Sequence, residues 1–153
     1  MGASIAILFI AFAILAGAML PVQGVINSQL GRHLDNVVLA TLVSFIVGAL
    51  SLLLVFFYRS SGSVGTSLQS LRDVPPMLYV GGVLGAVYVT AVAGLIPKVG
   101  VANTMIAVIL GQVLLSLLLD HYGLLGVEVR EVGWPRLFGA SLVILGLVLV
   151  VKF

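Results

Sequence analysis

This chain has amide side chains within an apolar run, and their type and spacing are suited to binding chemistry. Gln23 and Asn27 stand four residues apart in the stretch 20–32, LPVQGVINSQLGR, so a helix places both on one face. Hydrocarbon supplies no hydrogen-bond partner, so this face is expected to point at other helices or at a wet cavity. Pro21 can free the carbonyl of Gly17 and kink the helix. The pattern predicts either a transport site or hydrogen bonds that only join helices.

Three further candidates lie in later apolar runs. Gln112 is near the middle of its run, and Ser116 follows one helical turn later. Tyr88 can donate to a ligand, although the alternative, which we favour, is a bond from its hydroxyl to a neighbouring helix. We expect a substrate to contact Gln23, Asn27, Gln112, Tyr88 and Ser116; the amides of this set could instead bond one another.

Asp120 is the acidic group closest to an apolar run, because it directly follows Leu119. A carboxylate in that position can serve as a proton or cation site, which makes Asp120 the coupling-ion candidate. The alternative, which we favour, is an interfacial carboxylate paired with Arg130 or Arg136, or capping the turn.

Composition bounds the class of protein. Of 153 residues, 61% are hydrophobic and 8% are charged, against about 25% charged in soluble domains, so the chain is an integral membrane protein. Its net charge of +2 is too small for nucleic-acid binding. The sequence has no cysteine, and its two histidines lie far apart, so no metal site or cofactor is expected. Without a nucleophile–base pair or paired carboxylates in the apolar runs, no enzyme is expected either.

Charge-free segments locate the membrane spans. Five segments lack Asp, Glu, Lys and Arg, namely 3–31, 36–58, 74–97, 99–119 and 137–151. A spanning helix needs about 20 apolar residues, and flanking cations can extend the short fifth segment by snorkelling. The chain is therefore predicted to be an all-α membrane protein, one five-helix domain over 1–153 with spans at about 4–30, 37–58, 77–96, 102–119 and 136–151.

Turn residues mark where these spans are expected to end. Gly31 is a reasonable stop for the first span, and Asp35 or Asn36 is a candidate cap for the second. Residues 97–100, PKVG, predict a tight turn between the third and fourth spans. Small residues at helical spacing predict close helix packing in three spans. They are Ser44 and Gly48, Gly81 and Gly85, and Gly139 and Gly146.

Loop cations barely favour one orientation of the five spans. One side would hold four cations, and the other three: Arg59, Arg72, Arg130 and Arg136 against Arg32, Lys98 and Lys152. Cation asymmetry normally fixes orientation, so a bias of one predicts that copies insert both ways. Many transporters pair two inverted repeats, which an antiparallel homodimer of ten helices would supply. A hetero-pair with a sister protein of opposite orientation is also allowed.

The whole chain resembles the YdcZ family of the drug/metabolite transporter (DMT) superfamily. The resemblance is carried by PVQGVINSQLGR, VSFIVGAL, GGVLGAVYVT, GQVLLSLLLDHYGLLG and RLFGASLVILGLVLV, at 21–32, 43–50, 81–90, 111–126 and 136–150. Residues 111–150 also look like the end of an EamA-type repeat, with Asp120 at the carboxylate that closes its fourth span. The resemblance implies a bacterial inner-membrane exporter and one half of a ten-helix DMT-type inverted-repeat fold. The related small multidrug resistance proteins use a carboxylate in their first span, where this chain has only amides.

These observations favour a secondary transporter that exports a small solute by alternating access as an antiparallel homodimer. Its expected partners are the lipid bilayer, a second copy of itself and a small-molecule substrate. The competing hypothesis is a membrane scaffold or accessory subunit whose amides only join helices. A channel ranks lower, because no ring of charges or filter-like loop is visible.

Overall fold

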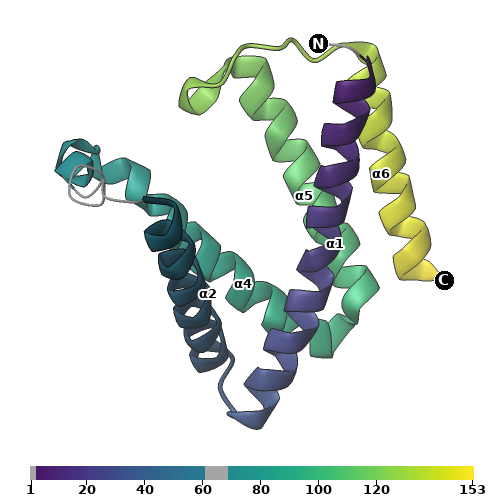
Figure 1. The fold of residues 1–153 in the computed structure, drawn as a ribbon. Coiled ribbons are helices and arrows are strands. Elements are labelled where there is room, and N and C mark those ends of the chain that lie inside the picture. The colour runs from purple at the N-terminus through teal and green to yellow at the C-terminus, as the bar shows by residue number, and fades with distance from the viewer. Residues whose placement is uncertain (1–2, 61–68) are drawn as a thin grey trace. The chain divides into compact units, whose positions relative to one another are not determined.

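Five long helices account for most of the chain in the computed structural model, which describes residues 3–60 and 69–153 (Figure 1). They are α1 (Ala3–His33), α2 (Val37–Ser60), α4 (Val80–Val99), α5 (Val101–Tyr122) and α6 (Trp134–Lys152). Short 3-10 turns occur at η1 (Ser70–Asp73), η2 (Pro76–Tyr79) and η3 (Leu124–Gly126). All five long helices are long and apolar enough to cross a membrane, so the prediction of five spans is confirmed.

Large apolar side chains cover the outside of these helices. Phe12 and Leu54, for example, are 71% and 74% exposed. The buried apolar side chains are few and mostly small: Ala40, Val92, Ala93, Ile96 and Ala140. A soluble domain would bury such residues in a core, whereas a membrane helix leaves them against lipid tails. This distribution agrees with a chain whose apolar surface is solvated by a bilayer.

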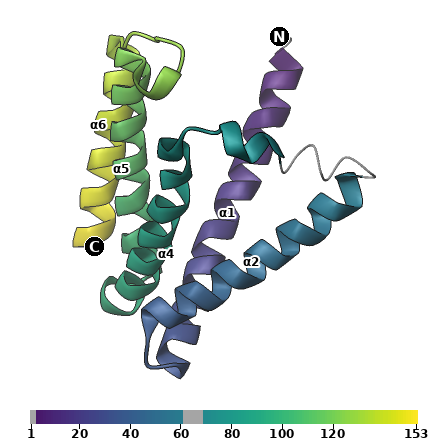
Figure 2. The same cartoon turned by 90° about the vertical axis from the view of Figure 1, so that its left-hand side faces the viewer.

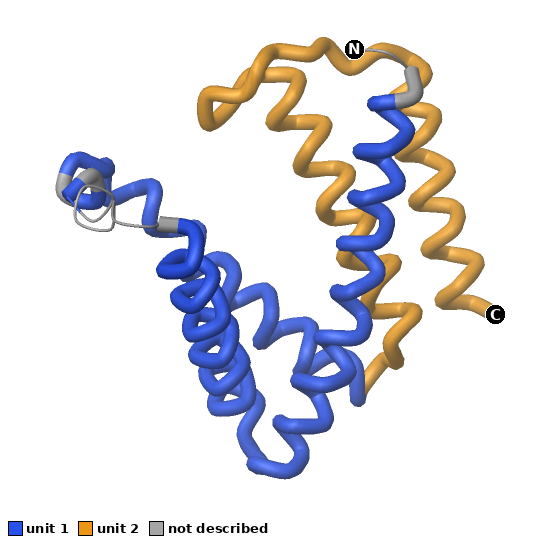
Figure 3. Tube along the Cα trace, in the orientation of Figure 1, with its two compact units in different colours: residues 1–97 blue, residues 98–153 orange. Residues whose placement is uncertain are grey.

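The chain divides into two compact units, residues 1–97 and residues 98–153 (Figure 3). The first contains α1, α2, η1, η2 and nearly all of α4, and the second contains α5, η3 and α6. The single five-helix domain expected from the sequence includes both units and stays a prediction.

A three-residue corner joins α1 to α2. Gly31 was expected to end the first span, but α1 continues to His33. Gly31 has a different use, because a Cβ added there would lie 3.2 Å from Val37 Cγ2, so the glycine lets the two helices meet closely. Of the two predicted caps, Asn36 is the one that acts: its Oδ1 accepts a hydrogen bond from Leu39 N at 3.0 Å. Asp35 instead takes the left-handed conformation at the turn, with φ 50°.

From this corner α1 and α2 diverge along their lengths, as both views show (Figures 1 and 2). Helix α4 packs on α2. An added Cβ at Gly85 would lie 3.6 Å from the ring of Phe45, and Thr90 Oγ1 lies 3.1 Å from Thr41 Oγ1. Thr41 and Thr90 are thus the polar contact that joins α2 to α4.

The link between α4 and α5 is shorter than predicted. Residues 97–100 were expected to form the turn, but α4 runs through Pro97 to Val99 and only Gly100 breaks the helix. Gly100 has φ 87°, a conformation that residues with a Cβ rarely adopt. The last turn of a helix tolerates Pro97 at the cost of one backbone hydrogen bond.

In the second unit α5 and α6 pack side by side as an antiparallel pair (Figures 1 and 2). Both helices are longer than the charge-free segments indicated, since α5 continues past Asp120 to Tyr122 and α6 begins at Trp134. Gly123 ends α5 in the left-handed conformation, with φ 60°. Residues 127–133 then return to α6 without forming a helix.

The N-cap of α2 gives a direct test of the corner between α1 and α2. Asn36→Ala should lower the free energy of unfolding by about 1 kcal/mol, because the amide of Leu39 loses its acceptor. Asn36→Asp keeps an acceptor oxygen and should stay close to wild type. Reversible unfolding in mixed micelles would measure both variants, and equal losses in the two would contradict the assigned cap.

Candidate functional site

Asn27 and Ser44 connect α1 to α2 through the predicted amide face. Asn27 is 2% exposed, and its Oδ1 accepts a hydrogen bond from the Ser44 hydroxyl. Ser44 was predicted as a small packing residue; its hydroxyl also has this polar role. The Asn27–Ser44 bond is the kind of interhelical contact that the accessory-subunit hypothesis assigns to the amides.

The other end of the Asn27 amide has no partner. Its Nδ2 is buried, and no acceptor in the described residues lies within hydrogen-bond distance. In the orientation described, the Ser44 hydroxyl donates to Oδ1, which leaves Nδ2 as the end without a partner. A buried polar group without a partner costs about 1–3 kcal/mol, so its presence points to a partner that binds from elsewhere.

A groove of about 660 Å³ runs between α1 and α2 beside this amide. Its polar lining residues are Gln23, Asn27 and Ser44. Gln23 lies one turn before Asn27 and is exposed, whereas Asn27 lines the groove from a nearly buried position. The rest of the lining is apolar or glycine: Leu15, Ala18, Met19, Val22, Ile26, Leu30, Val43, Val47 and Gly48. The first unit therefore contains a mainly apolar groove with two amides and one hydroxyl on its wall.

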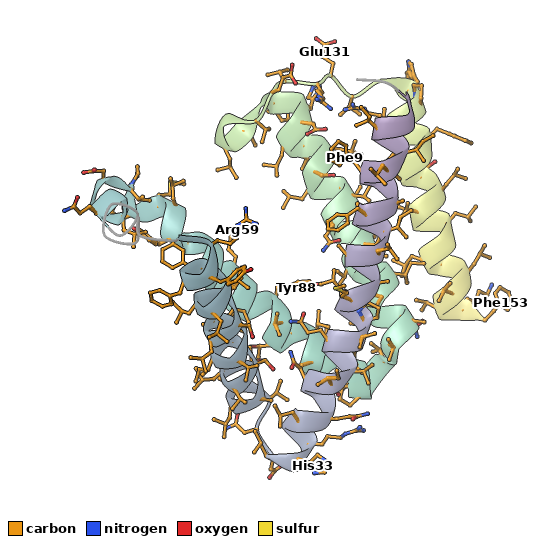
Figure 4. The ribbon with its side chains drawn as sticks, viewed as in Figure 1. Phe9, His33, Arg59, Tyr88, Glu131 and Phe153 are labelled. Atoms are coloured by element: carbon orange, nitrogen blue, oxygen red, sulfur yellow. The ribbon has the colours of Figure 1, made fainter. Side chains whose placement is uncertain are left out.

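Tyr88 supplies a second unsatisfied polar atom in the first unit. It extends from α4 toward α1 in Figure 4, and its buried hydroxyl has no hydrogen-bond partner in the described residues. The expected bond from this hydroxyl to a neighbouring helix is therefore not seen. Both unpartnered buried side-chain atoms described in the chain belong to residues singled out as substrate contacts.

Gln112 and Ser116 lie on α5 in the second unit, and both are exposed. The Ser116 hydroxyl donates to the Val113 carbonyl at 2.9 Å, so its bond is local to the helix. Their predicted convergence with the amides of α1 stays a prediction.

Asp120 forms an ion pair at the end of α5. Its Oδ2 lies 3.4 Å from Arg136 Nη1, with both side chains 40% exposed. Its backbone carbonyl accepts a hydrogen bond from Arg130 N at 2.8 Å, and the neighbouring His121 Nδ1 accepts one from Val132 N at 3.3 Å. These contacts favour the interpretation of Asp120 as an interfacial carboxylate that holds the 127–133 connection. Among the described residues, no group of three His, Cys, Asp or Glu side chains could hold a metal ion.

The predicted packing glycines differ in their surroundings. Gly146 lies on α6 with Ile106 of α5 3.9 Å from an added Cβ, and Gly85 faces Phe45 as described above. Gly48, Gly81 and Gly139 have no such neighbour within 4 Å, because they are exposed on their helices. Any packing at these three positions has to come from outside the units described.

Sequence reasoning missed the contact of Thr41 with Thr90, because hydroxyls are common in membrane helices and only their position within a helix pair distinguishes a cross-link. It also missed most groove-lining residues, which are apolar and resemble the lipid-facing residues beside them. The available signal was their spacing. Leu15 and Met19 continue toward the N-terminus the face that carries Gln23 and Asn27, and Val22 and Ile26 directly precede those two amides.

The ion pair of Asp120 can be tested by a double-mutant cycle. Asp120→Asn and Arg136→Gln should each lower the free energy of unfolding by under about 1 kcal/mol, because the pair is partly exposed. The double variant should lose little more than either single variant, since both changes remove one interaction. Reversible unfolding of the purified protein measures all four chains, and fully additive losses would contradict a direct pair.

Comparison with known proteins places the chain in a family. The family model described as "Putative inner membrane exporter, YdcZ" matches residues 8–149. The chain is 28% identical over 146 residues to the inner membrane protein YdcZ of Escherichia coli (strain K12), covering 95% of each chain. No solved structure matches significantly. The resemblance noted in the sequence is confirmed, and with the five spans it confirms an inner-membrane location. The chain therefore belongs to the YdcZ family, a family described as inner membrane exporters.

Proposed function

We propose that this chain is a secondary transporter that exports a small, uncharged polar or amphiphilic solute by alternating access. Family membership supports the coarse statement, a transport role rather than an enzymatic one. The observation that supports binding of a small solute is the buried Nδ2 of Asn27. This atom has no partner and belongs to a residue that lines a groove. A helix-joining amide would be expected to satisfy both of its ends inside the protein.

The proposed substrate contacts are the residues chosen from the sequence. Gln23 and Asn27 are available on the groove wall, and the Tyr88 hydroxyl is an unused donor in the same unit. Gln112 and Ser116 on α5 complete the proposed set, Gln112 through an exposed amide. None of these groups is charged, which fits a solute without a net charge.

Asp120 is the proposed coupling group only if the ion pair with Arg136 opens during transport. In the conformation described, the carboxylate already has a cationic partner at 3.4 Å. A proton or cation would compete with Arg136 for this oxygen. Coupling by Asp120 is therefore the less favoured part of the proposal.

We propose further that the working transporter is an antiparallel homodimer of ten helices. Five spans provide one repeat, and a four-to-three distribution of loop cations lets copies insert in both orientations. Gly81 and Gly139, where an added Cβ would meet nothing within 4 Å, are candidate surfaces for the second copy.

Orientation is the decisive measurement for this arrangement. A C-terminal reporter that is active only in the cytoplasm, and another active only outside it, should both give signal, because the cation bias is one residue. Adding two lysines to the 127–133 connection would make the distribution six cations against three and should shift the signal to one side. Signal on one face alone for the wild-type chain would remove the homodimer, and would leave only a hetero-pair with an oppositely inserted protein.

The role of the α5 amide can be tested by flux. In proteoliposomes carrying a solute chosen by thermal-shift screening, Gln112→Leu should reduce uptake at least tenfold while the dimer persists in chemical cross-linking. Gln29→Leu is the matched control, since it removes an exposed helical amide that is not among the proposed substrate contacts. Loss of dimer and thermal stability without any effect on flux would support the accessory-subunit hypothesis instead.

A further inference from the structure

We infer that the α1–α2 groove binds a neutral, mainly apolar molecule whose polar end is a hydrogen-bond acceptor such as a ketone, ester or amide carbonyl. This inference names a substrate class for the site and in that sense rests on the proposed function. The binding itself requires only the first unit, because every residue that lines the groove belongs to α1 or α2.

The unpartnered atom decides which polar group the ligand carries. The Asn27 oxygen already accepts from Ser44, so the free atom is a donor, Nδ2. A donor is satisfied by an acceptor, and a carbonyl oxygen is the acceptor that needs no charge and brings no unsatisfied hydrogen of its own. Gln23, one turn away and exposed on the same groove, provides both a donor and an acceptor for whatever lies beside that carbonyl.

The residues on the groove walls indicate the polarity and charge of the rest of the ligand. Nine of its twelve lining residues are apolar or glycine, and none is charged. A charged ligand would therefore lose its hydration without gaining a counter-ion, which is unfavourable in this environment. The volume of about 660 Å³ lies within the range of roughly 300–1,000 Å³ that is usual for small-molecule sites.

The direction of the groove suggests how such a molecule lies. Asn27 precedes the 34–36 corner by seven residues and Ser44 follows it by eight, whereas Leu15 and Gly48 lie farther from the corner along α1 and α2. Leu15 precedes Asn27 by twelve positions, or about 18 Å at the rise of an α-helix. The carbonyl would sit near the closed end and the apolar body would extend along the helices toward the open end.

Two other occupants fit less well. A phospholipid has apolar tails and ester carbonyls, but its charged headgroup would find no counter-ion among the lining residues. A helix of a second copy has its backbone carbonyls bonded within the helix, so it would leave the same donor unsatisfied unless a polar side chain happened to face it. The neutral carbonyl compound is the occupant that accounts for both the apolar walls and the free donor.

Benzophenone is a suitable probe, because it is neutral, has one carbonyl and attaches covalently to nearby C–H bonds on irradiation. In proteoliposomes of the full-length protein, we expect saturable labelling of Met19, Val43 and Val47, referenced to the unsaturable labelling of lipid-facing residues on α6. Fluorenone should displace this labelling at concentrations at least tenfold lower than fluorene, which has nearly the same shape and lacks the carbonyl.

Two variants separate binding from structure. Asn27→Leu removes the donor and should raise the half-saturating benzophenone concentration about 3- to 10-fold, the effect of one lost hydrogen bond. Ser44→Ala breaks the same Asn27–Ser44 bond but keeps the donor, so it should lower stability about as much as Asn27→Leu does and raise the half-saturating concentration less. A purely structural role for Asn27 would affect both variants alike.

The outcomes distinguish this inference from the transport proposal. Unsaturable groove labelling in the wild type, or equal displacement by fluorenone and fluorene, would overturn the inference even if flux of some other solute were found. Protection of the groove only under conditions that favour the dimer would assign it to a second copy, and would also overturn it. Saturable labelling that depends on Asn27, without any measurable flux, would support the binding site and contradict the transport proposal.

Discussion

The structure depends on one constraint: within the hydrocarbon of a bilayer, every hydrogen-bonding group needs a partner from the protein or from a bound molecule. Most hydroxyls of the spans meet it locally. Thr41, Ser51 and Thr104 each donate to the carbonyl four residues earlier. Groups that cannot do so determine how the first unit is assembled. The backbone N–H groups around Asn27 are already bonded within α1, so the Asn27 oxygen accepts from Ser44 across the helix pair and links α1 to α2.

The same constraint explains why the polar contacts of the two units differ in charge and in position. In the first unit the cross-helix contacts are uncharged, through Asn27 with Ser44 and Thr41 with Thr90, and they lie within the spans. In the second unit the charged contact, Asp120 with Arg136, lies at the ends of α5 and α6, where side chains are 40% exposed. Charge is much cheaper at the interface than at the centre of the bilayer. Uncharged groups can therefore hold helices together within the spans, whereas charged groups hold them together at the span ends.

The sequence was sufficient for the number of spans and insufficient for their exact ends. Burying a charge in mid-membrane costs roughly 2.5–3.5 kcal/mol, so charge-free segments are a strong signal and all five were found. The same rule does not give the helix ends, because α1 continues through Arg32 and His33, and α5 through Asp120, where a span end at the interface tolerates charge. The candidate site was predictable only in part. The face that carries Gln23 and Asn27 follows from helical spacing, but its contact with Ser44 depends on how two helices pack, which spacing within one helix does not determine.

The two meanings given to the amides, helix joining and substrate binding, are not exclusive. A carboxamide has an acceptor end and a donor end, and in Asn27 the two ends are in different situations. The oxygen holds α2, whereas the nitrogen retains an unmet demand for a partner. A side chain fixed by one end is better positioned to bind with the other, because its rotamer has already been ordered by folding. The cost of the unmet donor then falls on the empty state, and a ligand that satisfies it gains that free energy on binding. On this argument the bond to Ser44 favours ligand binding by Asn27, since it both orients the amide and leaves the other end free.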